Sequence, residues 1–187
     1  MNLYTNFNNN SSKVKPNKKQ KKFYLVALLI ILITFASSYN KLISNFGAYF
    51  ISSTDLTNIY IDDISLGNTL DSLDLSQYTH SDKYSNENYN LIFDELMISE
   101  ENNTINKIYG RFNKVKVKVN DTMLSKNIDT LDSILGTSYI KATYDTEQLT
   151  SQRIYIDKEN KIKATFIYQT LDSGSNIQII TIIVEKL

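Results

Sequence analysis

The chain of 187 residues contains no cysteine, no tryptophan, one proline and five glycines. The absence of cysteine excludes disulfides, thiol catalysis, thiolate metal sites and the lipidated cysteine of a lipoprotein. The few glycines form neither a GxGxxG nor a Walker A motif, so the common phosphate-binding loops are absent. The one histidine, His80, lies in "YTHSDKY" without a second metal ligand or a nucleophile motif. We therefore expect no cofactor and no metal.

The charges of the chain are unevenly distributed although their sum is zero, with 20 basic and 20 acidic residues. Six lysines precede Phe23, while no acidic residue precedes Asp55. The part after the lysines therefore holds 14 basic and 20 acidic residues, a net charge of −6. Phosphate affinity depends on Lys and Arg, so this acidic part is not expected to bind nucleic acid.

One segment is apolar enough for a membrane: "FYLVALLIILITFASSY", residues 23–39. A membrane span needs roughly 20 apolar residues, with a range of about 17–25, so this segment is at the lower limit. The lysines before it predict a cytoplasmic N-terminus by the positive-inside rule. We therefore expect a single-pass protein of the cell membrane, with residues 1–22 as a disordered cytoplasmic tail and the C-terminal domain outside the cytoplasm.

The alternative to an uncleaved anchor is a signal peptide. Basic residues, an apolar run and the small residues Ala36 and Ser38 also satisfy the usual cleavage pattern. Cleavage near Ser38 would release a secreted protein with an inhibitor-like role. The abundance of Asn, Ile, Lys and Tyr is typical of an AT-rich bacterial genome.

Residues 40–58 are predicted to form a juxtamembrane stalk. Leu42, Phe46, Tyr49 and Phe50 have the i, i+4, i+7, i+8 spacing of one helix face. A helix that continues from the anchor explains this spacing, and an amphipathic segment on the membrane is the alternative.

The domain predicted over residues 59–187 contains two similar short segments, which we call the echo. "LGNTLDSLDLSQY" begins at Leu66, and "NIDTLDSILGTSY" begins at Asn127. We interpret each segment of the echo as the start of a helix, with Asn68 and Asp129 as the capping residues. Asp71 and Asp132 then lie in the first turns, where a carboxylate interacts favourably with the positive end of the helix dipole. The echo divides the domain into two repeats, about residues 59–113 and 114–187.

The remaining segments alternate as β-strands do. In "KVKVKV", from Lys114 to Val119, valines and lysines point to opposite faces. The final "NIQIITIIVEKL" is apolar on both faces from Ile179 and should lie centrally in a sheet. The predicted fold is α+β: two tandem helix-plus-antiparallel-strand repeats forming one curved sheet, preceded by a single transmembrane helix.

These segments resemble the tandem repeat of the β-lactamase-inhibitor-protein-like and SmpA/OmlA-type domains. The resemblance covers Tyr60 to Leu187, and is carried by "ISLGNTLDSL", "YNLIFDEL" and "INKIYGRF", then by "NIDTLDSILGTSY" and "RIYIDKENKIKATFIY". It implies the fold just described and an interaction role outside the cytoplasm. It does not imply β-lactamase inhibition, because no inhibitory-loop motif is present.

Few residues suggest catalysis. Asp94 and Glu95, with Glu100 and Glu101, could act as the paired carboxylates of a surface hydrolase, which is the less favoured alternative. Their neighbours are turn residues, so we predict no enzymatic activity and no catalytic residues. Tyrosine is enriched at protein interfaces. The predicted function is therefore a non-enzymatic module that binds a protein or envelope component through its sheet surface, with candidate residues Tyr84, Tyr89, Tyr109, Tyr144, Tyr155 and Tyr168.

Overall fold

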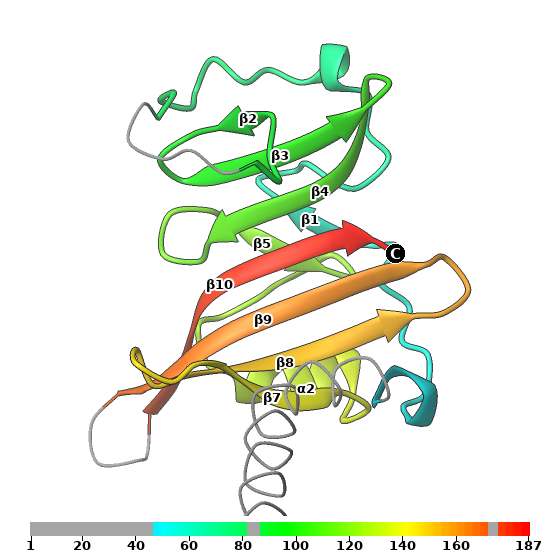
Figure 1. Cartoon of the computed structure of the whole chain (residues 1–187), viewed down its shortest axis with the longest axis vertical. Helices are drawn as coiled ribbons and strands as arrows, with labels where there is room; N and C mark the ends of the chain where they lie inside the picture. Colours follow the sequence, from blue (N-terminus) through cyan, green and yellow to red (C-terminus); the bar gives the residue numbers. More distant parts are fainter. Residues whose placement is uncertain (1–46, 82–86, 172–175) are drawn as a thin grey trace, which may run out of the picture. The chain divides into compact units, whose positions relative to one another are not determined.

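The computed structural model describes residues 47–81, 87–171 and 176–187, which belong to the compact unit Asn40–Leu187 (Figure 1). The tail predicted over residues 1–22 and the membrane segment predicted over residues 23–39 lie outside the described residues. Within the described ranges, no helix is long and apolar enough to cross a bilayer.

Two antiparallel sheets make up most of the unit. The larger has seven strands in the order β2-β3-β4-β10-β9-β8-β7, and the smaller has the order β1-β5-β6. The strands are β1 (Ile59–Ile61), β2 (Leu91–Ile92), β3 (Leu96–Glu101), β4 (Thr104–Arg111), β5 (Val117–Val119), β6 (Thr122–Met123), β7 (Ile140–Asp145), β8 (Thr150–Asp157), β9 (Ile162–Leu171) and β10 (Asn176–Lys186). Helical structure includes a turn over residues 47–50, the 3-10 helix η1 (Leu70–Ser72) and the α-helix α2 (Asp129–Leu135).

The predicted α+β fold of two helix-plus-strand repeats in one curved sheet is wrong. The described unit is mostly β, with two separate antiparallel sheets and little helix. The first echo forms only the three residues of η1, because its backbone bonds to the β3–β4 turn instead of continuing a helix. The Leu70 N–H donates to the Asn103 carbonyl at 3.0 Å, and the following Leu73 is extended.

The second echo does form the expected helix, α2. Its apolar stripe of Ile128, Leu131 and Leu135 is buried, as the spacing predicts. Gly136 ends the helix with φ of 78°, a value that glycine adopts without strain. The cap differs from the prediction, because the Asp129 N–H donates to the Asn127 side-chain oxygen at 3.0 Å.

The two halves of the domain share a backbone pattern, but the residues that are equivalent in this pattern are not those that an alignment of the two "TLDS" sequences would pair. In each half a strand ends in two consecutive residues of positive φ, as in type I′ turns: Asp62 and Asp63, then Asn120 and Asp121. The bond from Leu70 to Asn103 has its counterpart in the bond from the Ile128 N–H to the Ile177 carbonyl at 3.2 Å. Leu70 is thus structurally equivalent to Ile128. An alignment of the two "TLDS" sequences would instead pair Leu70 with Leu131.

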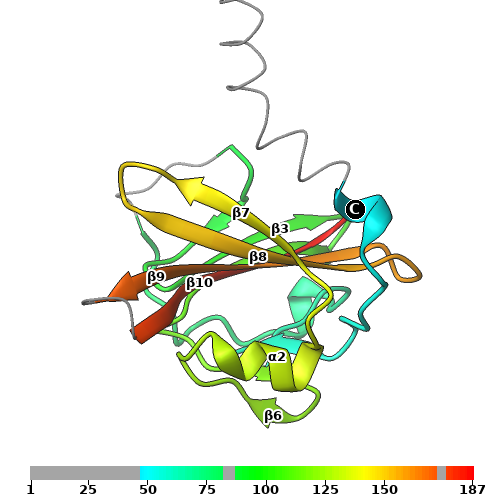
Figure 2. The same cartoon turned by 90° about the horizontal axis from the view of Figure 1, so that it is seen from below.

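The main core lies between the larger sheet and the layer of α2 and the smaller sheet (Figure 2). Phe166 and Ile182 of the larger sheet and Leu131 of α2 are each 0% exposed. Fully burying such a side chain contributes about 1.5–3 kcal/mol. The layers approach closely at Gly110, where an added Cβ would lie 3.0 Å from side-chain atoms of Ile61 and Val115.

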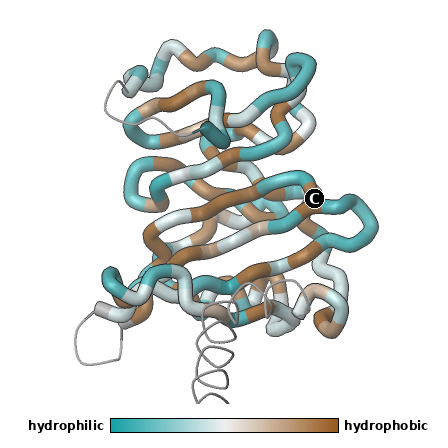
Figure 3. Tube along the Cα trace, in the orientation of Figure 1, coloured by the Kyte–Doolittle hydropathy of each residue, from teal (hydrophilic) through white to brown (hydrophobic). Residues whose placement is uncertain are grey.

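Strand β10 occupies the centre of the larger sheet, as its apolar sequence predicts, with β4 on one side and β9 on the other. Figure 3 shows hydrophobic residues along β10 and β9 and a hydrophilic β8–β9 turn. The valines of β5 are buried, and Lys116 beside them is exposed, so this segment is the half-buried strand that its alternation predicts.

The described part of the predicted stalk is packed against the domain. Ala48 and Ile51 contact a second apolar cluster made by Ile140, Ile154 and Ile156. Leu56 is only 2% exposed and belongs to the main core. The prediction of a separate stalk over residues 40–58 is therefore corrected for residues 47–58, because apolar burial joins them to the sheet.

A buried carboxylate fixes this segment. Asp157, at the end of β8, is 1% exposed and accepts hydrogen bonds from the Leu56, Glu159 and Asn160 N–H groups and from the Asn160 amide. Burial alone would raise the pKa of Asp157, but the bonds from Asn160, Leu56 and Glu159 outweigh it and hold the pKa below its ordinary value. The carboxylate therefore remains ionised and tied to the chain at residue 56.

We expect Asp157→Ala to lower the free energy of unfolding by about 3 kcal/mol, because the buried Leu56 N–H and the part-buried N–H groups of Glu159 and Asn160 lose a charged acceptor. Urea denaturation followed by circular dichroism measures the change. Asp74→Ala is the matched control, since Asp74 also accepts two turn bonds, from the Ser76 N–H and hydroxyl, but is exposed. Its cost should stay below about 1 kcal/mol. Equal losses in the two variants would contradict the role of Asp157.

Candidate functional site

The larger sheet has one face turned away from the main core, which we call the outer face. In β4 and β10 the residues Ile108, Ile182 and Val184 point into the core. Strand alternation therefore puts Tyr109 and Ile183, which pair with each other, on the outer face. In Figure 2, β7 and β3 lie on the opposite side of β9 and β10 from α2, so the outer face is the concave side of the sheet.

A row of alternating charges crosses the outer face. Glu185 of β10 is 2.9 Å from the Lys107 ammonium of β4 and 2.5 Å from the Lys163 ammonium of β9. The three residues are neighbours in the strand register. Burial opposes ionisation of Glu185, but hydrogen bonds from Lys163 and Lys107 outweigh it and hold its pKa below the ordinary value. The row ties three central strands together through their side chains.

Beside this row lies a cluster of three tyrosines. The Tyr89 and Tyr109 rings are 6.3 Å apart in an edge-to-face arrangement, and the Lys107 ammonium is 5.2 Å from the Tyr89 ring centre. Tyr144 of β7 is 52% exposed. We call Tyr89, Tyr109 and Tyr144 the tyrosine surface. Edge-to-face ring pairs and cation–π contacts each contribute about 0.5–1 kcal/mol, so this surface is partly ordered before any ligand arrives.

The hydroxyl groups of Tyr89 and Tyr144 are neutral at ordinary pH, because the pKa of each is raised. Burial, followed by the charges of Glu185, Tyr109 and Tyr144, raises the pKa of Tyr89. Burial and the charges of Tyr109 and Asp145 raise the pKa of Tyr144. The interaction of these phenols indicates that they are close together, although Tyr89 precedes β2 and Tyr144 lies near the opposite edge of the sheet. A neutral phenol can both donate and accept a hydrogen bond.

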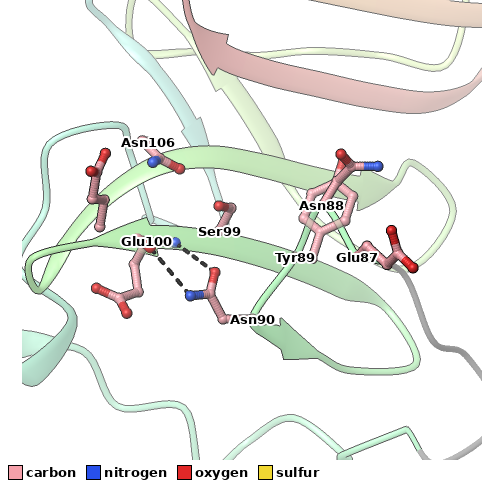
Figure 4. Close-up of a pocket in the computed structure, with 8 residues that line it drawn as sticks. Glu87, Asn88, Tyr89, Asn90, Ser99, Glu100 and Asn106 are labelled. Atoms are coloured by element: carbon pink, nitrogen blue, oxygen red, sulfur yellow. Dashed lines mark hydrogen bonds between the residues drawn. The ribbon is translucent and has the colours of Figure 1, made fainter.

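A polar pocket of about 530 Å³ adjoins the tyrosine surface (Figure 4). Its lining comes from the segment before β2 and from β3 and β4: Glu87, Asn88, Tyr89, Asn90, Ser99, Glu100, Glu101 and Asn106. The Asn90 side chain bonds to both the backbone N–H and carbonyl of Glu100, at 3.1 and 3.2 Å. These bonds fix the wall of the pocket and leave amide, hydroxyl and carboxylate groups beside an aromatic ring.

Of the six predicted tyrosines, Tyr89, Tyr109 and Tyr144 lie on one face, and Tyr155 and Tyr168 do not. Tyr84 is outside the described residues. Tyr155 and Tyr168 are 0% and 6% exposed, so they are corrected from surface to core residues. Tyr155 packs against Phe166 and donates to the Gly136 carbonyl at 3.3 Å. The alternation of the sequence predicts the burial of Tyr168, because it continues the series Ile162, Ala164 and Phe166 at every second position. It makes no such prediction for Tyr155, because the neighbours in "IYI" are apolar on both faces of the strand.

Sequence reasoning missed the residues that surround the tyrosines. Lys107, Lys163 and Glu185 come from three strands, and only the strand order brings them together. Asn106 and Ser99 likewise become neighbours of one pocket through the β3–β4 pairing. The alternation of Lys107, Ile108 and Tyr109 signals that the lysine and the tyrosine share a face, but not which face is open.

Of the carboxylates considered for hydrolysis, two occupy a turn and two end strand β3. Asp94 and Glu95 are the middle residues of a turn closed by the Phe93 N–H and the Leu96 carbonyl at 2.8 Å. Glu100 accepts a bond from the Asn103 N–H at 2.8 Å in the β3–β4 turn. Across the described ranges, no three His, Asp or Glu side chains gather as a metal site. The geometry thus gives the Glu100 side chain a turn-stabilising role.

We expect Glu185→Gln to lower the free energy of unfolding at pH 7 by about 1–2 kcal/mol, because two lysines lose their partner. The folded pKa of Glu185 is lowered, so its stabilising contribution is complete above the unfolded pKa of about 4.3 and is lost as pH falls through the folded pKa. The difference between the variant and the wild type should therefore shrink below pH 4 in urea titrations. Glu101→Gln, at the exposed last residue of β3, is the control. A pH-independent difference would contradict the ion-pair explanation.

Comparison with known proteins shows no relative: no family model, no curated protein and no solved structure matches this chain. The resemblance to β-lactamase-inhibitor-protein-like and SmpA/OmlA-type domains stays a prediction from the sequence.

Proposed function

We propose that this chain is a membrane-anchored, extracytoplasmic, non-enzymatic module that binds a protein or another envelope component through the outer face of its larger sheet. The observation that carries the proposal is the tyrosine surface, in which Tyr89, Tyr109 and Tyr144 gather on the concave side of the sheet. Tyrosine contributes a large contact area and a hydroxyl group at a small entropy cost.

The surroundings of the tyrosine surface support a role of these residues in binding a partner rather than a purely structural role. The core-facing side of the sheet is covered by α2 and the smaller sheet, and residues 47–51 cover only the outer-face cluster of Ile140, Ile154 and Ile156. Tyr144 is 52% exposed and, among the described residues, belongs to neither apolar cluster. The polar pocket next to Tyr89 adds hydrogen-bonding groups at the rim. An aromatic centre with a polar rim is the usual composition of a protein interface.

Placement outside the cytoplasm rests on the lysine-rich start and the apolar segment of residues 23–39. We expect the mature protein in the membrane fraction to retain Met1 and the six lysines. N-terminal sequencing of the isolated protein measures this directly. A mature chain that begins after Ser38 would instead support the secreted form and remove the anchor from the proposal.

The binding role is tested by Tyr144→Ser in the full chain. The protein is crosslinked in its native membranes and isolated, and the material bound to wild type and variant is compared. Loss of an exposed aromatic contact should weaken retention of a specific component by roughly tenfold. Leu149→Ser is the matched control, because Leu149 is 80% exposed and lies in the β7–β8 connection, outside the three residues that make up the tyrosine surface.

Two results would count against the proposal. If the wild type retains no specific component, the chain is not a binding module. If Tyr144→Ser and Leu149→Ser retain the same component as strongly as the wild type, binding uses another surface.

A further inference from the structure

Two aromatic side chains are exposed where the described chain begins. Tyr49 and Phe50, in the helical turn of residues 47–50, are 80% and 86% exposed. Ala48 and Ile51 of the same segment contact the cluster of Ile140, Ile154 and Ile156. The segment thus partly buries its small and aliphatic residues against the sheet and exposes its two aromatic residues. Figure 1 shows the helical turn where the described chain begins.

The exposure is a fixed feature because the turn is held at several points. The Lys158 ammonium donates to the Ile51 carbonyl at 2.6 Å and to the Tyr49 carbonyl at 3.4 Å. The Ser52 N–H donates to the Ser138 hydroxyl at 2.8 Å. At Gly47 an added Cβ would lie 3.0 Å from the Ile140 side chain, so the turn is seated closely on β7. Movement of either aromatic ring into the core would break these hydrogen bonds and contacts.

We propose that Tyr49 and Phe50 insert into the interfacial layer of a lipid bilayer and thereby fix how the domain is held against the membrane. Tyr49 follows the apolar segment of residues 23–39 by ten residues, which span about 15 Å as helix and at most about 36 Å when extended. The headgroup layer is about 5–8 Å thick on each side of the hydrocarbon core, so a linker of this length allows Tyr49 to lie in that layer when the linker runs along the membrane surface. Amphipathic aromatic residues are enriched at this depth.

Sequence spacing and charge add to this argument. Leu42 and Phe46 precede Tyr49 and Phe50 at helical spacing, so the sequence alone predicts an apolar face that includes these four residues. Lys158 holds its ammonium beside the turn, where it suits anionic lipid headgroups. Transfer of apolar surface out of water supplies the driving force, about 25 cal/mol per Å². The inference rests on the membrane anchor of the proposed function and adds a second, peripheral contact to it.

The absence of tryptophan allows a direct test, because one introduced tryptophan is the only such fluorophore in the chain. The full chain is reconstituted in phosphatidylcholine vesicles that contain a minor share of phosphatidylglycerol and a headgroup-labelled quenching lipid. Three variants are compared: Phe50→Trp, Leu149→Trp as an exposed control on the domain, and Phe35→Trp within the apolar segment. We expect Phe50→Trp to lose about half of its emission to the headgroup quencher and Leu149→Trp to lose little.

Phe35→Trp separates failure of this inference from failure of the anchor. It should be quenched by lipids brominated in the acyl chain if residues 23–39 lie in the bilayer. Quenching of Phe35→Trp with an unquenched Phe50→Trp would overturn the interfacial contact and leave the anchor intact. Absence of quenching in both would overturn the two proposals together, and equal quenching of Phe50→Trp and Leu149→Trp would show contact without the specific orientation proposed.

Discussion

The pairing of β10 with β4 is the constraint on which the larger sheet depends. The first half of the domain contributes β2, β3 and β4, and the second contributes β7 to β10. Only the ladder between β4 and β10 joins these groups, with Ile182 opposite Gly110 and Val184 opposite Ile108. Both faces of β10 are largely apolar, so any position at a sheet edge would expose them to water. Burial of β10 between β4 and β9 thus selects the strand order.

The same pairing creates the outer face. Because side chains alternate along a strand, fixing Ile182 and Val184 in the core turns Ile183 and Glu185 outward. Glu185 then meets Lys107 and Lys163 from the flanking strands, and Lys107 meets the ring of Tyr89. Structure and proposed function are linked here, since the residues that stabilise the centre of the sheet also position the tyrosine surface. The tyrosines of the opposite face serve packing, as Tyr155 does against Phe166.

Local patterns in the sequence were sufficient for individual elements. The stripe of Ile128, Leu131 and Leu135 predicts α2, Gly136 predicts its end, and the apolar run after Ile179 predicts a central strand. The first "TLDS" shows the limit of this reasoning. Its letters match those of the second, but Leu70 bonds to the Asn103 carbonyl, and the segment therefore stops after one short turn. Helical propensity over so few residues is weak and yields to tertiary hydrogen bonds.

The sequence by itself determined the alternation within each strand, the buried face of α2, the acidic balance of the domain and the lysine-rich and apolar start of the chain. These features depend on residues near one another along the chain. Only the tertiary structure decided that two sheets form and that Asp157 ties residue 56 to the β8–β9 turn. It also decided that the Tyr89 and Tyr109 rings pack together on the face that carries Tyr144, while Tyr155 and Tyr168 are buried. The physical reason is that strand order and register join residues far apart in sequence, and a pattern of alternation shows which residues share a face without showing what covers that face.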